Sequence, residues 1–198
     1  MSTLVITLPL GSPQAPADYS YTLTVDGHNA TQQASASAAL LPDPGRTGEV
    51  VAVVPVRALS WQRVTLPPGA LAQSARLRAV LDGLLEEQLL DDPAQLHFAL
   101  QPGAQSGSPA WVAVCDRAWL RQALQALEAA GRPADRVVPE FAPGPTASGR
   151  EECEVLGQPE DAYAVLTGHG AQQAVAVLPL AAARALFTQA PGDEDENP

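Results

Sequence analysis

Runs of apolar residues predict short strands in the first quarter of the chain. Residues 3–8 are continuously apolar or β-branched, which is typical of a central strand buried on both faces. Residues 19–25 alternate apolar and polar side chains, as in a half-buried strand, and the Asp26–Gly27 pair favours a two-residue hairpin turn. A polar stretch, residues 31–48, then leads to residues 49–54, which predict a second buried strand. The chain is therefore expected to open with a β-meander and not with a dinucleotide-binding fold.

The middle of the chain predicts a strand, a helix and two more strands. Residues 61–66 favour a strand, and residues 77–90 carry apolar side chains at the three- and four-residue steps of a surface helix. Pro93 is expected to end this helix, because proline disfavours helical geometry at the residue before it. Residues 96–100 and 110–115 predict the two further strands. The apolar stripe comprises Leu77, Val80, Leu81, Leu84, Leu85 and Gln88, and the side chains expected to face water are Arg76, Arg78, Asp82, Glu86 and Glu87.

The sequence contains signals for both ends of a second helix. Asp116 is a good N-terminal cap, and Gly131 followed by Pro133 is a standard C-terminal stop. Its apolar positions are Leu120, Ala123, Leu124 and Leu127. Near the end of the chain, residues 180–187 predict a shorter, alanine-rich helix.

The organisation expected from these patterns is two lobes. Residues 142–149 are rich in proline and glycine and favour a linker, and residues 162–167 and 173–178 beyond it predict paired strands. We assign residues 1–142 to a first lobe with an inserted strand-helix-strand segment at about 56–101, and residues 143–198 to the linker, the start of a second lobe and an acidic tail.

Composition narrows the classes of partner and the compartment. The net charge of −11 argues against nucleic acid or an anionic membrane as a partner, because both are bound through clustered cations. The two cysteines do not resemble a disulfide framework, which favours a reducing compartment. The sequence shows no signal peptide and no apolar run of the roughly 18 residues that a membrane span needs. The chain is therefore expected to be soluble and cytoplasmic.

The order of the predicted elements is that of the actin-like, ribonuclease-H-like superfold, which makes a nucleotide site the first chemistry to consider. In active members, two hairpin turns hold phosphates with backbone amides while a carboxylate organises Mg²⁺. Here the first connection, residues 9–13, has prolines and no carboxylate, and the second turn, residues 167–170, has glycines but no acid. The three histidines are far apart, without metal-ligand spacing. We predict no catalytic, cofactor-binding or metal-binding residues, with an actin-like ATP-binding protein or phosphotransferase as the alternative.

Four acidic side chains, Glu86, Glu87, Asp91 and Asp92, lie near the C-terminal end of the predicted central helix. The helix dipole favours cations at that end, so an external basic partner would relieve a small misfit of about 0.3 to 1 kcal/mol per charge. The alternative is an ordinary solvated face. The two interpretations differ in whether these carboxylates belong to a binding surface.

Several short stretches within residues 49–141 together resemble one family, the cytoplasmic domain of type II secretion system protein L. The resemblance rests on residues 63–67 (RVTLP), 85–89 (LEEQL), 96–99 (LHFA), 111–115 (WVAVC) and 138–140 (VPE). It implies an actin-like α/β fold of mixed sheets and flanking helices that has lost its nucleotide site. The related pilus-assembly M proteins share the central layout but would normally keep nucleotide-binding residues.

The resemblance also implies a role without catalysis. In the family, the cytoplasmic domain is an adaptor that recruits the secretion ATPase, the E protein, to the inner membrane, and the full-length protein also contacts the M and F components. This implies a soluble fragment at the cytoplasmic face of the bacterial inner membrane that ends before the transmembrane helix, and a homodimer stays open. We expect Glu86, Glu87, Asp91 and Asp92 to contribute to ATPase binding by meeting basic residues of the partner.

Overall fold

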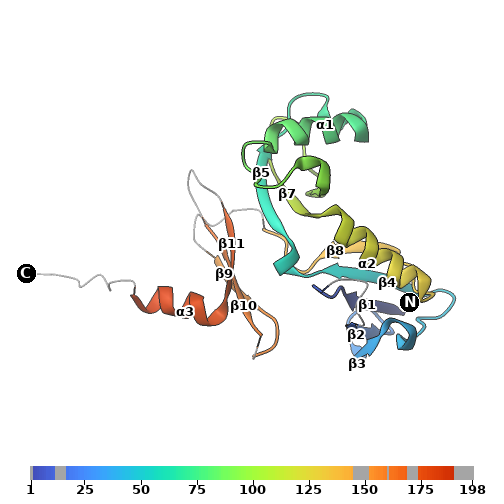
Figure 1. Cartoon of the computed structure of the whole chain (residues 1–198). Coiled ribbons are helices and arrows are strands. Elements are labelled where there is room, and N and C mark those ends of the chain that lie inside the picture. The colour runs from blue at the N-terminus through green and yellow to red at the C-terminus, as the bar shows by residue number, and fades with distance from the viewer. Residues whose placement is uncertain (1, 12–16, 145–151, 160, 169–173, 190–198) are drawn as a thin grey trace, which may run out of the picture. The chain divides into compact units, whose positions relative to one another are not determined.

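The structure, a computed structural model, describes residues 2–11, 17–144, 152–159, 161–168 and 174–189 (Figure 1). The chain divides into two compact units, Met1–Ala142 and Pro143–Pro198, which are described separately below. The first unit contains a five-stranded and a three-stranded sheet, and the second contains another three-stranded sheet. Among the described residues, no helix combines the length and the apolar character that crossing a membrane requires.

The five-stranded sheet of the first unit is mixed. Its order is β3-β2-β1-β4-β8, with antiparallel pairing from β3 to β1 and parallel pairing from β1 through β4 to β8. A parallel pair needs a long crossover between its strands, and here the crossover from β4 to β8 carries the whole second sheet. The strands are β1 Thr3–Thr7, β2 Asp18–Thr24, β3 Ala30–Ser37, β4 Glu49–Val54 and β8 Arg136–Pro139.

One face of this sheet packs against the helix α2, Arg117–Ala129 (Figure 1). Leu4 and Ile6 of β1 are fully buried and lie opposite Val50 and Ala52 of β4, so the four side chains share one face. The helix contributes the buried Leu120, Ala123 and Leu127 to the same core. The other face of β1 is only half-buried, so the prediction that this strand is buried on both faces is wrong for that side.

The second hairpin strand, β3, and the turn before it differ from the sequence prediction. Five residues, 25–29, separate β2 from β3 instead of the predicted two. The Asp26 carboxylate accepts hydrogen bonds from the backbone N–H groups of His28 (2.9 Å) and Asn29 (2.8 Å), which lowers the pKa of Asp26 to about 2. β3 itself lies where the sequence predicts a polar connection, because its side chains are nearly all exposed at the sheet edge and carry no burial pattern.

The three-stranded sheet of the first unit is antiparallel and packs against α1, Ser74–Leu85. Its order is β5-β7-β6, with β5 Ser60–Thr65, β6 Leu96–Leu100 and β7 Pro109–Asp116. Short 3₁₀ helices, η1 Ala38–Leu40, η2 Val56–Ala58, η3 Ala70–Ala72 and η4 Pro93–Gln95, connect the elements of this unit. The core beneath α1 comprises Val64, Leu66, Ala70, Leu81, Leu85, Leu96, Val112 and Val114.

The helix α1 ends earlier than the sequence predicts. It stops at Leu85, whereas the periodic pattern continues to Leu90 and Pro93 was expected to end it. The backbone N–H groups of Gln88 and Leu89 both donate to the carbonyl of Leu85, so a turn satisfies these groups without a further helical turn. Leu89 packs back onto the core, while Leu90 is left outside it.

The second unit is a small antiparallel sheet followed by a helix. Its strand order is β11-β10-β9, with β9 Glu152–Leu156, β10 Tyr163–Thr167 and β11 Val175–Pro179, and α3 spans Leu180–Gln189. The predicted strand pair and helix are confirmed as β10, β11 and α3. β9 was not predicted, because four of its five residues are exposed. Most of the predicted linker and the whole acidic tail lie outside the described residues.

Candidate partner-binding site

The four acidic residues singled out in the sequence lie in one loop. Glu86 and Glu87 follow the end of α1, and Asp91 and Asp92 precede η4, so the structure places them in residues 86–92 and not on the outer face of a longer helix. All four are exposed. The segment holds no basic residue, so its net charge is concentrated in a short stretch of surface.

Asp92 has a structural task in addition to its charge. Its Oδ1 accepts a hydrogen bond of 2.8 Å from the backbone N–H of Ala94, which caps η4. The carbonyl of Asp92 accepts a second bond of 2.8 Å from the N–H of Gln95. These bonds fix the end of the acidic loop against the start of β6.

Arg78, which the sequence analysis expected to face water, instead ties α1 to this loop. Its Nη1 donates to the carbonyl of Leu96 (2.8 Å), and its Nη2 donates to the carbonyl of Pro93. Its Nε lies 2.8 Å from Oδ1 of Asp82, and the guanidinium carbon lies 4.3 Å from the ring centroid of Phe98. A planar group with five donors can make such a set of contacts, and the result is a loop held at its C-terminal end.

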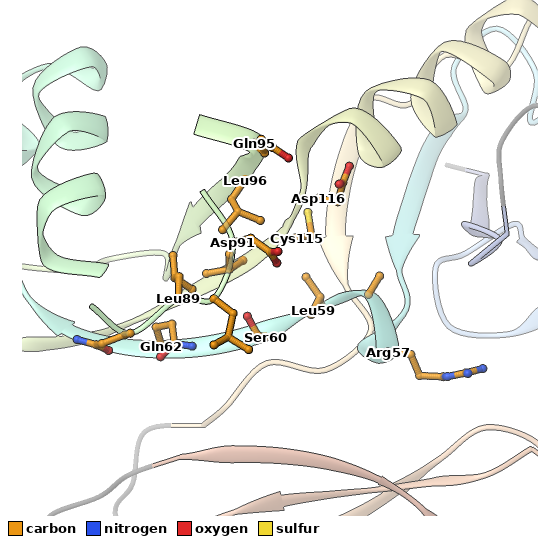
Figure 2. A pocket seen from close by; sticks show the side chains of 14 residues that line it. Arg57, Leu59, Ser60, Gln62, Leu89, Asp91, Gln95, Leu96, Cys115 and Asp116 are labelled. Carbon is orange, nitrogen blue, oxygen red and sulfur yellow. The ribbon is translucent and has the colours of Figure 1, made fainter. Parts of the chain in front are cut away.

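A groove of about 470 Å³ runs beside the acidic loop (Figure 2). Residues 88–91 line it together with Arg57, Ser60 and Gln62 from η2 and β5. Gln95 and Asp116 add polar groups at its margin. The apolar part of the lining includes Leu59, Leu96, Val114 and Cys115.

A second groove of about 260 Å³ lies between β6, β7, α2 and β8. Its lining is almost entirely apolar, and His97 and Cys115 are the exceptions. Burial of the ring, and then the charges of Arg117 and Arg78, lower the pKa of His97. His97 is an exposed residue that lines this groove, and its pKa lies below that of an ordinary histidine.

Cys115 lines both grooves, and its environment is that of an inert thiol. Burial, with a smaller contribution from the charge of Asp116, raises the pKa of Cys115 to about 11. A thiol with its pKa raised in this way is protonated at neutral pH, and the protonated form is a poor nucleophile. Leu59 also lines both grooves.

The sequence also raised metal-binding residues and two phosphate-binding turns as possible sites. Within the described ranges, no three His, Cys, Asp or Glu side chains gather closely enough to hold a metal ion. The two turns compared above with phosphate loops lie partly outside the described residues, at residues 12–13 and 169–170. The feature that the sequence did not predict is the groove, because its lining comes from segments about 30 residues apart.

Comparison with known proteins identifies a family and a fold. The chain matches the model of the family "Type II secretion system (T2SS), protein L" over residues 6–151. No curated protein matches it. Among solved structures, the cytoplasmic domain of EpsL, an inner membrane component of the type II secretion system of Vibrio cholerae, is 22% identical with a TM-score of 0.67, and the match covers 100% of this chain and 79% of that chain.

A second solved structure is the PilM–PilN type IV pilus biogenesis complex. The identity is 18% and the TM-score 0.52, and the match covers 90% of this chain and 61% of that chain. Both likenesses are below 25% identity and show the fold alone. They confirm the predicted fold class, an actin-like α/β arrangement of mixed sheets with flanking helices. Because the family model covers well over half of the chain, this protein belongs to the type II secretion system protein L family.

Proposed function

We propose that this domain is a non-enzymatic adaptor that recruits the secretion ATPase, the E protein, by protein–protein contact. Membership of the protein L family, an inner-membrane platform component, is the observation that carries the proposal. In the full-length protein the same platform role involves the M and F components. The domain then acts at the cytoplasmic face of the inner membrane, with a soluble part turned toward the ATPase.

The acidic loop is the part of this surface that we assign to the ATPase. Glu86, Glu87, Asp91 and Asp92 are exposed within seven residues that contain no compensating cation. Arg78, the nearest basic side chain on α1, is already engaged by Asp82 and by two backbone carbonyls. A surface of this kind attracts a basic partner over a distance of about one Debye length, roughly 8 to 10 Å at physiological salt.

The test is a paired charge reversal. The double variant Glu86→Arg/Glu87→Arg should weaken binding of the purified ATPase roughly tenfold at low salt and flatten the salt dependence of binding. Its melting temperature should stay close to wild type, because exposed charges contribute only about 0 to 1 kcal/mol to stability. Biolayer interferometry at two salt concentrations measures the first effect, and differential scanning fluorimetry measures the second.

A matched control separates local charge from net charge. Glu128→Arg/Glu154→Arg makes the same change in net charge at two exposed positions on α2 and β9. This variant should bind the ATPase as wild type does. Wild-type affinity in the Glu86/Glu87 variant would contradict the assignment of the loop, and an ATPase that fails to bind the wild-type domain would contradict the adaptor function itself.

A further inference from the structure

One apolar side chain stands out on the acidic loop. Leu90 is fully exposed, with a relative accessibility of 105%, and this is the highest value among the large hydrophobic side chains that the structure describes. Single exposed leucines are common on protein surfaces and need no explanation by themselves. Leu90 differs because it lines the 470 Å³ groove and lies between acidic residues on both sides in the sequence.

The groove has the layered make-up of a binding interface. Its lining includes Leu96 and Val114, which are buried in the hydrophobic core under α1, and the half-buried Leu59 and Leu89. The lining also carries polar groups that can donate or accept hydrogen bonds, among them Ser60 and Gln62. Protein interfaces likewise combine an apolar centre with polar groups around it.

The charges around the groove select the chemistry of its occupant. Asp91 and Asp116 line it, and Glu86, Glu87 and Asp92 belong to the adjoining loop or to its end, while Arg57 is the basic residue of the lining. The acidic side chains therefore outnumber the basic one. An occupant that buries apolar side chains there gains from lysine or arginine residues beside them.

We propose that Leu90 and this groove form the apolar centre of the ATPase interface, and that the ATPase presents a basic amphipathic helix to it. The helix lays its apolar side chains over Leu59 and Leu89 and against the exposed Leu90. Its cations point toward Asp91, Glu86 and Glu87. This inference rests on the proposed function. It adds Leu90 as the residue that supplies affinity, because charges at the rim mainly set the association rate and the register.

The test compares leucine variants in the intact domain. Leu90→Ala should weaken ATPase binding by about tenfold or more, as truncation of a central anchor does. The loss should persist at high salt, unlike the loss in the charge-reversal variant, because salt does not screen apolar contact. Leu40→Ala is the matched control: Leu40 is also highly exposed, at 74%, but it lies on η1. It should bind as wild type does.

Blocking the groove gives an independent readout. Ser60→Trp places a large side chain in the groove and should weaken binding, whereas Ala99→Trp does the same in the second groove and should not. Equal affinities for Leu90→Ala and wild type would overturn the inference while leaving the adaptor function in place. Absence of binding by the wild-type domain would instead remove the proposed function and this inference with it.

Discussion

The two helices of the first unit are fixed to it in different ways. At the start of α2, Asp116 accepts a hydrogen bond of 2.6 Å from the N–H of Trp119, and after its end Gly131 adopts a φ of +73°. Arg132 then donates to the carbonyls of Leu41 and Pro42. α1 begins at Ser74, and its N-cap residue, Gln73, makes no side-chain capping hydrogen bond. It is held mainly by side chains, above all by the burial of Leu81 and Leu85 and by the bonds of Arg78.

The difference teaches where a protein of this kind can place a binding surface. Local signals at both ends of α2 leave little backbone free for another task. The end of α1 has no glycine or proline stop, and the seven residues after it carry the acidic loop and Leu90. Binding segments are commonly drawn from the less stable parts of a fold, because only these parts can adjust to a partner.

The largest effects should come from the two cores. Leu127→Ala, under α2, should reduce the free energy of unfolding by about 3 to 5 kcal/mol, and Leu85→Ala, under α1, by about 2 to 3 kcal/mol, since both side chains are fully buried. The smaller loss at Leu85 is expected because the adjoining loop can partly close the cavity. Urea unfolding followed by circular dichroism measures both, and Leu84→Ala, at a partly exposed position, serves as the control. Equal losses of unfolding free energy at Leu127 and Leu85 would contradict the view that the two helices are fixed to the unit in different ways.

An intermediate effect should follow from removing Arg78. Arg78→Met keeps the stem of the side chain but loses the bonds to two carbonyls and to Asp82, so stability should fall by about 1 to 3 kcal/mol. Arg78→Lys should recover little, because a single ammonium cannot reach the same set of acceptors. Hydrogen exchange should show faster exchange at Ala94 and Gln95 in both variants. Protection unchanged from wild type would show that Arg78 is not what holds this loop.

The smallest effects should come from the helix caps. Asp116→Ala should cost about 1 kcal/mol, because the N–H of Trp119 loses its acceptor. On α1 a cap can be added. Gln73 has the extended backbone of an N-cap residue, with φ −148° and ψ 143°. Gln73→Asp should therefore raise the free energy of unfolding by roughly 0.5 to 1 kcal/mol. Thermal unfolding of both single variants measures the two shifts. A destabilised Gln73→Asp variant would mean that α1 is limited by packing and not by its missing cap.

Most of the elements that bury side chains could be predicted from the sequence. β1, β4, β7 and α2 carry burial periodicity or end signals that depend only on neighbouring residues. β3 and β9 could not be predicted, because their side chains are exposed and only backbone pairing makes them strands. β8 is four residues long, and it is fixed from outside by the carboxylates of its flanking residues.

Those carboxylates explain why β8 needs tertiary context. Asp135 accepts a hydrogen bond of 2.8 Å from the N–H of Val50, and Glu140 accepts one of 2.8 Å from the N–H of Val56. The partners are more than 80 residues away in the sequence, so no local pattern reveals them. The candidate site also has one part that the sequence predicts and one part that depends on tertiary structure. The acids could be named from the sequence, but the groove and the exposure of Leu90 depend on how α1 ends.

The direct passage from β7 into α2 has a mechanical consequence. β7 belongs to the sheet under α1 and ends at Asp116, and α2, which packs on the other sheet, begins at Arg117, so no loop residue lies between them. An extended strand already spans about 3.3 Å per residue and has almost no slack to give. A pull applied at the α1 side would therefore pass along β7 directly into α2, with no loop residue between them to lengthen first.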